Sequence, residues 1–296
     1  MPNIQEPKGV CFFAYNNEQI DYVELATLAA LYVKEYLDLP VCLITDEGTD
    51  YWLKDSKPRG LVKHCFDYIV ITDDDMKSNP RRHFDSPWSE FQAQFSNSNK
   101  HKVWDYSPFE QTLLLDIDYI IKSNFLLDGF KNQGVTMFNT ARDLRNDMPM
   151  IREQYLYEAG IKMWWSTVIA FDRSEESKLF FDTWSHIADN YAFYQYLYNF
   201  PPKLFRTDYC VSIAAHILNG MTDGDAISAF DGPMFNLNQK DDLVEVQSMN
   251  DWIMLSNDSR EPWKNILVKD SNLDLHVMNK RALGRMYNKL VEFFVE

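Results

Sequence analysis

The sequence lacks any long apolar run, which a chain that crosses a membrane as a helix requires. Its 296 residues contain no stretch of about 18 or more uncharged apolar residues, whereas a helix needs about 20 to span a bilayer. The N-terminal residues MPNIQEPKGVCFFAY also lack the basic segment, apolar stretch and small-residue cleavage site that mark an exported chain. We therefore expect no membrane span and a cytoplasmic location.

Cysteine and positive charge are both scarce. Cys11, Cys42, Cys65 and Cys210 form no CxxC pair and no close Cys/His spacing. A zinc site of that type is excluded, and we expect four reduced, buried thiols.

There are 29 Lys and Arg residues against 44 Asp and Glu residues, giving a net charge of -15. A general polyanion-binding protein is not expected, because neutralising phosphates requires clustered basic side chains.

Short apolar segments alternate with a helical pattern in the first third of the chain. GVCFFAYN is an apolar run rich in aromatic residues, and residues 18–40 then carry apolar side chains at helical spacing. VCLITDEGTD and FDYIVIT are two more buried-type strands that end in polar residues. This order predicts a mixed α/β, Rossmann-like fold in which helices flank a mostly parallel sheet and ligands bind at the carboxyl ends of its strands.

The rest of the chain continues the mixture of strands and helices. TLLLDIDYII, GVTMF and WSTVIAFDRS are predicted strands, and a long amphipathic helix is predicted to begin after Ser174 as its N-cap. We expect a further helix around Ser89 to Phe95, inside a long polar segment. Because no repeat or interdomain linker occurs, residues 1–296 are predicted to form one domain.

Two carboxylates interrupt the apolar run LLLDIDYII. Burying one carboxylate without a partner costs on the order of several kcal/mol, so Asp116 and Asp118 need either a cation or exposure to solvent. In an extended chain, residues two apart face the same side, so the two carboxylates converge while Ile117 points away. Such a pair suits Mg²⁺ or Mn²⁺, with substrate phosphates completing the coordination shell.

The same Asp-X-Asp spacing occurs at two other places in the chain, Asp73/Asp75 and Asp223/Asp225. The second of these lies between glycines in a turn-like stretch, and only Asp116/Asp118 has apolar runs on both sides. Spacing alone leaves a metal site and a solvated strand end equally open.

Taken together, these segments resemble the GT-A fold glycosyltransferases, especially the glycogenin-like (family 8-like) and galactosyltransferase-like retaining enzymes. KVWDYSPFEQTLLLDID is similar to the approach to that family's Asp-X-Asp motif, and LDLHVMNKRAL to its C-terminal His and Lys segment. The resemblance implies that Asp116, Asp118 and His276 bind Mn²⁺ or Mg²⁺ and that Lys280 contacts the diphosphate of the donor. VMN stands where the family commonly has a Gly between the His and the Lys.

Two further segments carry the resemblance. FFAYNNEQIDY is similar to the nucleotide pocket of the family, which implies donor contacts from four residues: Ala14, Tyr15, Asn17 and Tyr22. Tyr22 also fits ordinary packing of a helix against the sheet. FRTDYC resembles the family's Asp-Gln stretch and implies that Asp208 contacts the sugar or the acceptor, although helix N-capping by Thr207 or Asp208 fits equally well.

Two basic clusters, residues 81–83 and 100–102, bracket the long polar segment in this acidic chain. They predict a local phosphate-binding surface. We assign Lys102 to the diphosphate of the donor, while a nucleic-acid acceptor remains an alternative use of the same surface.

The predicted function is therefore metal-dependent transfer of a hexosyl or pentosyl group from a nucleotide diphosphate sugar, a UDP-sugar, to an acceptor, with retention. Asp116, Asp118 and Asp208 are the predicted catalytic residues. Residues 1–125 would bind the nucleotide sugar, and residues 126–296 would bind the acceptor and supply the C-terminal metal and phosphate segment. The acceptor is left open between a saccharide, a protein and a modified nucleic acid.

Three alternatives stay open: a viral-type glycosyltransferase acting on modified DNA bases, a nucleotidyltransferase, and a non-catalytic sugar-nucleotide binder. A nucleotidyltransferase is expected to carry a Gly-rich, basic loop directly after its first strand. The corresponding stretch, YNNEQIDY, contains neither Gly nor Lys, which counts against that alternative.

Overall fold

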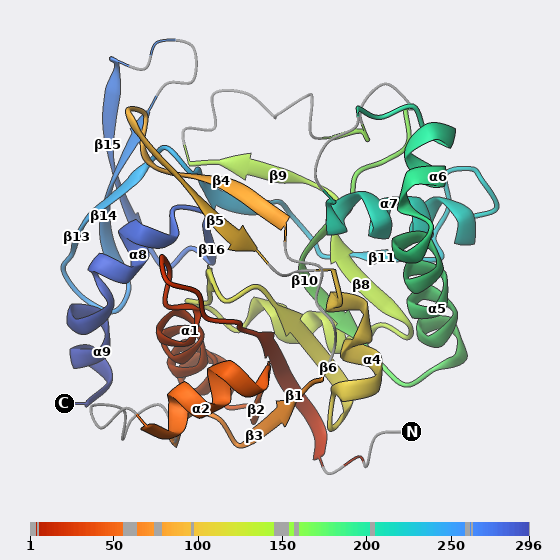
Figure 1. Cartoon of the computed structure of the whole chain (residues 1–296), viewed down its shortest axis with the longest axis horizontal. Helices are drawn as coiled ribbons and strands as arrows, with labels where there is room; N and C mark the ends of the chain where they lie inside the picture. The colour runs from red at the N-terminus through yellow and green to blue at the C-terminus, as the bar shows by residue number, and fades with distance from the viewer. Residues whose placement is uncertain are drawn as a thin grey trace.

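A seven-stranded sheet forms the centre of the protein (Figure 1). The computed structural model describes residues 4, 6–55, 64–73, 79–95, 98–144, 154–156, 160–201, 205–257, 261 and 263–295. In spatial order the strands are β11 (Ser228–Ala229), β8 (Val135–Phe138), β10 (Trp165–Phe171), β6 (Phe109–Leu115), β1 (Glu6–Phe13), β2 (Val41–Thr45) and β3 (Tyr68–Ile71). Paired strands run parallel except where β10 meets β6 and β8. The predicted mixed α/β fold with a mostly parallel sheet is confirmed.

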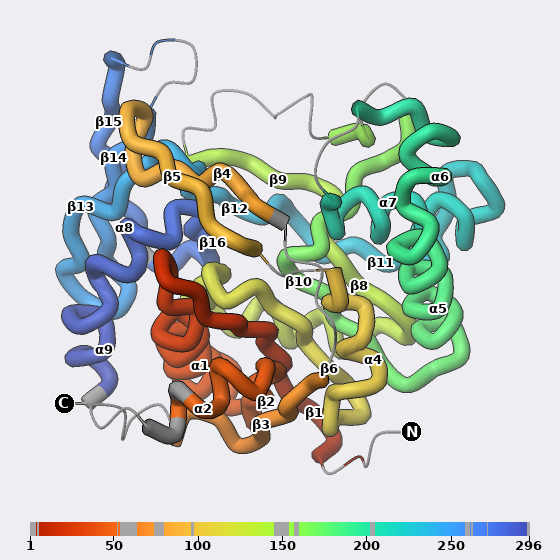
Figure 2. The backbone as a smooth tube through the Cα atoms, in the orientation of Figure 1, coloured from red at the N-terminus to blue at the C-terminus, as the bar shows by residue number. Residues whose placement is uncertain are grey.

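Helices flank this sheet. They are α1 (Tyr22–Leu37), α2 (Glu47–Asp55), η2 (Phe125–Lys131), α5 (Glu175–Asp189), α6 (Tyr191–Leu197) and α7 (Thr207–Leu218). Helix α1 begins because the carboxylate of Asp21 accepts the N–H of Glu24 at 3.0 Å, and it ends where Asp38 adopts φ of 50°. The C-terminal helices α8 (Lys280–Arg285) and α9 (Tyr287–Val295) contact α1. The C-terminal helices thus pack beside the first helix of the chain, while the two chain ends lie on opposite sides of the molecule (Figure 2).

The helix predicted after Ser174 is present, but it is two helices rather than one. Ser174 caps α5, and its hydroxyl accepts the N–H of Ser177 at 3.3 Å. At Asn190 the chain leaves the helix, and the Asn190 side chain donates to the carbonyl oxygen of His186 at 2.9 Å. Because an asparagine side chain competes with the helical hydrogen bonds, the helix stops there and restarts as α6.

The helix predicted around Ser89 to Phe95 is wrong, because this segment is a strand. β4 (Asn79–Ser86) and β5 (Ser89–Phe95) form an antiparallel hairpin. At its turn the hydroxyl of Ser86 accepts the N–H groups of Trp88 and Ser89. Apolar residues at every second position of SEFQAQF match the two-residue period of a strand. The short helices η1 (Lys100–Lys102) and α4 (Val103–Tyr106) come next along the chain.

Two smaller sheets complete the fold. One has the order β7 (Tyr119–Ile120), β16 (Leu275–Val277), β12 (Met234–Leu237) and β9 (Ala141–Asp143). The other contains β13 (Asp242–Val246), β14 (Asp251–Asn257) and β15 (Asn265–Ser271). In the first sheet His276 of β16 pairs with Tyr119 of β7. A C-terminal strand is therefore fixed next to the segment that comes after β6.

The buried apolar side chains form one continuous cluster, whose largest fully buried members include Trp184, Trp252 and Tyr32. All four cysteines are buried and unpaired, as predicted. Among the described residues, no helix combines the length and apolar character needed to cross a bilayer.

Candidate functional site

A cavity opens where β1 and β6, two parallel neighbours, reach their carboxyl ends. Its walls come from the end of β1, the start of α1, the β4–β5 hairpin, η1, the residues after β6, the first residues of β10 and α7, and the segment joining β16 to α8. The predicted location of a ligand site at the carboxyl ends of the strands thus coincides with a cavity.

Asp116 and Asp118 lie in a turn that links two sheets. The N–H of Asp116 still bonds to the carbonyl oxygen of Thr167 on β10, at 2.9 Å. The N–H of Tyr119 then bonds back to the carbonyl oxygen of Asp116, at 3.0 Å. The expectation that an extended strand brings the two carboxylates together is therefore wrong. A turn between β6 and β7 does so, because the chain leaves the central sheet at Asp116.

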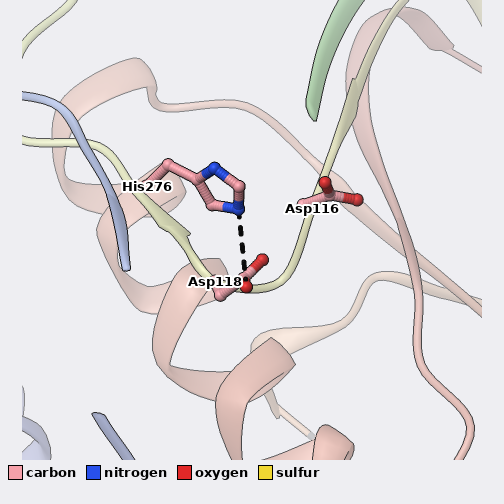
Figure 3. A group of neighbouring side chains, drawn as sticks. All are labelled: Asp116, Asp118 and His276. Atoms are coloured by element: carbon pink, nitrogen blue, oxygen red, sulfur yellow. Dashed lines mark ion pairs between the residues drawn. The ribbon is translucent and has the colours of Figure 1, made fainter. Parts of the chain in front are cut away.

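The two carboxylates and the ring of His276 converge in the cavity. One ligand atom from each of Asp116, Asp118 and His276 lies within 4.8 Å of the others, and Figure 3 shows the imidazole pointing toward the carboxylates. The Nε2 atom of His276 is 3.5 Å from Oδ2 of Asp118. Two carboxylates and one imidazole are a donor set that suits Mn²⁺ or Mg²⁺, so these residues fit such an ion.

The imidazole is held from its other side. Nδ1 of His276 is 3.1 Å from Oδ1 of Asn236, and the parallel pairing of β12 with β16 places these two residues opposite each other. An amide oxygen accepts a hydrogen bond, so it selects the ring form that carries its proton on Nδ1. In that ring form Nε2 would offer its lone pair to an ion held between it and the carboxylates.

Each carboxylate also meets a lysine. Nζ of Lys280 contacts Oδ2 of Asp118, and Nζ of Lys100 is 2.6 Å from Oδ1 of Asp116. Burial opposes ionisation of Asp118, but Lys280 and His276 more than offset it and hold the pKa of this carboxyl well below its usual range. Asp118 is therefore a carboxylate at neutral pH although it is only 2% exposed.

Of the lysines in the cluster 100–102, the structure brings Lys100 into the cavity. Its ammonium also donates to the carbonyl oxygen of Ser166 at 2.5 Å. Lys102, at the far end of the three-residue turn η1, is not among the described residues that line the cavity. The contact of Lys102 with the diphosphate stays a prediction, and Lys100 is the lysine of this cluster that lines the cavity.

The residues predicted for the nucleotide divide into two pairs. Tyr15 and Tyr22 line the cavity, and burial raises the pKa of the Tyr22 hydroxyl above its usual value. Ala14 and Asn17 lie in the same loop but outside the described lining. The side chain of Asn17 donates to the carbonyl oxygen of Gln94 at 2.9 Å, which ties this loop to the hairpin.

Asp208 faces strand β10. Its Oδ1 accepts hydrogen bonds from the N–H and the hydroxyl of Ser166, at 3.0 and 2.8 Å, and its Oδ2 is 3.1 Å from Arg206. Burial opposes ionisation of Asp208, but Arg206 and the Ser166 bonds outweigh it and lower the pKa of the carboxyl. Asp208 lies inside the first turn of α7 and Arg206 takes the N-cap position, so Asp208 is not the helix cap.

The hairpin supplies a second basic wall. Arg81 and His83 line the cavity, whereas Arg82, between them, points outward to Glu90 at 3.4 Å.

Sequence reasoning missed Arg206, although its position two residues before Asp208 was a usable signal. It also missed Asn236, which carries no local pattern at all.

The buried polar atoms of the cavity wall that have no hydrogen-bond partner in the described part of the chain include Nε2 of His83 and Nε1 of Trp165, on side chains that are 7% and 6% exposed. Buried polar atoms are nearly always satisfied, by protein, water or ligand. This wall is therefore built for a polar ligand.

No family model and no curated protein matches the chain. Among solved structures it is similar to the glycosyltransferase GlyE of Streptococcus pneumoniae TIGR4, with 12% identity, a TM-score of 0.42, and coverage of 77% of this chain and 46% of that one. It is similar to the galactosyltransferase LgtC, solved with donor and acceptor sugar analogues, with 13% identity, a TM-score of 0.43, and coverage of 76% and 73%.

A third similar structure is the mannosyltransferase PcManGT of Pyrobaculum calidifontis in complex with GDP-Man and Mn²⁺, with 13% identity, a TM-score of 0.37, and coverage of 77% and 58%. The chain thus spans less than half of GlyE. All three are glycosyltransferases, the class that the sequence resembles. Because the identities and TM-scores are this low, the function of the chain has to be inferred from the geometry of its own site.

Proposed function

We propose that this protein is a metal-dependent glycosyltransferase that uses a nucleotide diphosphate sugar, a UDP-sugar, as its donor. One observation carries the proposal: Asp116, Asp118 and His276 converge, with Lys280, in a cavity at the carboxyl ends of parallel strands. A diphosphate needs both a divalent cation and a basic side chain beside it, and this arrangement offers both.

Asp116, Asp118 and His276 would hold Mn²⁺ or Mg²⁺, and the bound ion would supply positive charge to the departing diphosphate. Lys280 and Lys100 would also stabilise the negative charge of the diphosphate, because each ammonium lies against one of the carboxylates of the metal site, in the same cavity. Tyr15 and Tyr22 line the same cavity and would contact the nucleotide.

Asp208 is placed to accept hydrogen bonds from hydroxyl groups of the sugar or the acceptor. Ser166 and Arg206 fix its carboxylate in the ionised form, so it enters the reaction already oriented. We propose that residues 1–125 hold the nucleotide sugar and residues 126–296 hold the acceptor and complete the metal and phosphate contacts. Retention at the transferred carbon is part of the proposal, and an NMR measurement of the product anomer tests it.

The experiment for the function is an assay of nucleoside diphosphate release. The full chain is incubated with a panel of UDP-, GDP- and dTDP-sugars, with Mn²⁺ or with EDTA. We expect one nucleotide class to be hydrolysed or transferred only with the metal, and the activity to disappear in Asp116→Ala/Asp118→Ala. Asp223→Ala/Asp225→Ala is the matched control, because it removes the same spacing from an exposed turn. Donor binding without turnover would favour a sugar-nucleotide binder instead.

A further inference from the structure

The β4–β5 hairpin places one guanidinium group inside the cavity. Residues alternate along β4, so Arg81 and His83 face the cavity while Arg82 faces outward. Opposite Arg81 in the ladder stands Ala93, a small buried residue that leaves room for the long side chain. The guanidinium lies over the ring of Phe95, 4.9 Å from its centroid. Packing against Phe95 therefore helps to set its position.

Arg81 has no carboxylate of its own among the described residues. The three carboxylates of the lining are already engaged: Asp116 by Lys100, Asp118 by Lys280, and Asp208 by Arg206. Arg81 is half-buried. A guanidinium stays charged in proteins, and removing part of its hydration without a counter-charge is costly. Burial and the neighbouring positive charge of Arg206 lower the pKa of Arg81, so the two guanidinium groups repel each other across the cavity.

The charge of the cavity exceeds what a nucleotide sugar uses. Four basic side chains, Arg81, Lys100, Arg206 and Lys280, face three carboxylates in the lining. A divalent ion balances the two negative charges of a diphosphate, so the excess positive charge of the wall remains after the donor and metal are bound. The unsatisfied Nε2 of His83 and Nε1 of Trp165 add two more polar atoms that face no protein partner among the described residues.

We infer that Arg81 and Arg206 together bind an anionic group, a carboxylate or a phosphate, carried by the transferred sugar or by the acceptor. The inference rests on the proposed function, since it concerns a ligand beside the donor diphosphate. The planar fork of a guanidinium matches carboxylate and phosphate oxygens in pairs. Arg81 and Arg206 line the same cavity as Asp116, Asp118 and His276, so the anion would lie in that cavity beside the metal group. The substrate is thus an acidic sugar compound, and the hairpin sets this preference.

Binding measurements test the inference without requiring turnover. In the donor arm, UDP-glucuronic acid and UDP-glucose are titrated calorimetrically with Mn²⁺ present. In the acceptor arm, glucose 6-phosphate, glucuronate and glucose are titrated into protein saturated with UDP and Mn²⁺. We expect the anionic compound to bind about tenfold or more tightly than its neutral counterpart in one arm, as for a hydrogen bond between charged groups. The arm that shows it identifies the source of the anion.

The matched variants are Arg81→Gln and Arg82→Gln, two neighbours of one strand with opposite orientations. Arg81→Gln is expected to abolish the preference, and Arg82→Gln to keep it. If Arg81→Gln does not fold, Arg81→Lys replaces it. This variant keeps the positive charge but loses the paired donors of the guanidinium, and it is expected to reduce the preference for the anionic compound. Equal binding of anionic and neutral compounds in both arms, with UDP and Mn²⁺ bound, would overturn the inference alone. Failure of UDP and Mn²⁺ to bind would instead contradict the proposed function.

Discussion

Two of the three Asp-X-Asp triplets of the chain, Asp116/Asp118 and Asp223/Asp225, stand in contrasting settings. Asp223 and Asp225 stand in an exposed turn after α7, where the side chain of Asn219 accepts the N–H of Ala226 at 2.8 Å. Asp118, with the same spacing to Asp116, is 2% exposed. It meets a lysine 162 residues away in the sequence. The spacing itself does not make a site. Two features distinguish Asp116/Asp118 from the other triplet. The turn follows an apolar strand and is buried, and a distant segment of the chain places cationic side chains against it.

The largest expected effect comes from Asp118→Asn. The change removes a metal ligand and leaves Lys280 buried without its counter-charge. Metal-dependent turnover should fall by about 10²- to 10³-fold or more, and the free energy of unfolding should drop by on the order of 3 kcal/mol. Diphosphate release and chemical denaturation measure the two effects.

Asp225→Asn is the control for the same chemistry in the other triplet. It should leave both turnover and the free energy of unfolding nearly unchanged, because the side chain is exposed. Equal losses of turnover and stability in Asp118→Asn and Asp225→Asn would contradict the difference between the two triplets.

Asn236→Ala sharpens the comparison by leaving all three metal-site side chains in place. Without the amide oxygen 3.1 Å from Nδ1 of His276, the ring loses the partner that orients Nε2. Loss of such an orienting partner typically weakens metal affinity by about tenfold or more. A Mn²⁺ titration followed by calorimetry measures it, and an unchanged affinity would mean that this hydrogen bond does not position the ligand.

Lys100→Met should shift metal affinity the other way. The ammonium 2.6 Å from Asp116 occupies the same oxygen that a metal would use. Removing a competing unit charge is worth about 1 kcal/mol even in bulk water and more at a buried site, so Mn²⁺ should bind the nucleotide-free protein about fivefold or more tightly. Donor turnover should nevertheless fall, since the diphosphate loses a charge partner. Lys178→Met, on the exposed face of α5, is the control, and weaker Mn²⁺ binding in Lys100→Met would refute the competition.

The hairpin should also give the stability of the protein a dependence on pH. Burial, and then the positive charges of Lys280 and Arg81, lower the pKa of His83 to about 4. As pH falls below about 6.5, the unfolded chain binds a proton at this residue and the folded protein does not. Stability is therefore lost between pH 6.5 and about 4. Denaturant unfolding of the wild type and His83→Phe across this range should show a smaller loss in the variant, whereas parallel curves would contradict the assignment.

Local periodicity accounts for the part of the fold that the sequence predicted. The strands of the central sheet and helices α1 and α5 carry apolar side chains at their own repeat, so each could be recognised without tertiary information. The two strands of the β4–β5 hairpin were not predicted, because their few apolar residues are separated by charged and polar residues within a long polar segment. The break at Asn190 and the turn at Asp116 each depend on one or two hydrogen bonds, which periodicity does not reveal.

The candidate site divides in the same way. Asp116 and Asp118 could be recognised from the sequence, because carboxylates inside an apolar run need a cation or exposure to solvent. His276 and Lys280 came from a resemblance, and neither spacing nor composition assigns them. Arg206 stands two residues before Asp208 and could have been found from the sequence. Asn236 is a single polar residue whose role arises only when β12 pairs with β16, so a tertiary structure was needed to find it.

One measurement addresses the central claim, that Asp116, Asp118 and His276 form a metal site for a diphosphate. Mn²⁺ is titrated into the full chain with UDP present, and bound ions are counted by electron paramagnetic resonance. The account predicts one bound Mn²⁺ in the wild type and in Asp223→Ala/Asp225→Ala, and none in Asp116→Ala/Asp118→Ala. Mn²⁺ binding that is the same in all three proteins, or lost only in Asp223→Ala/Asp225→Ala, would contradict it.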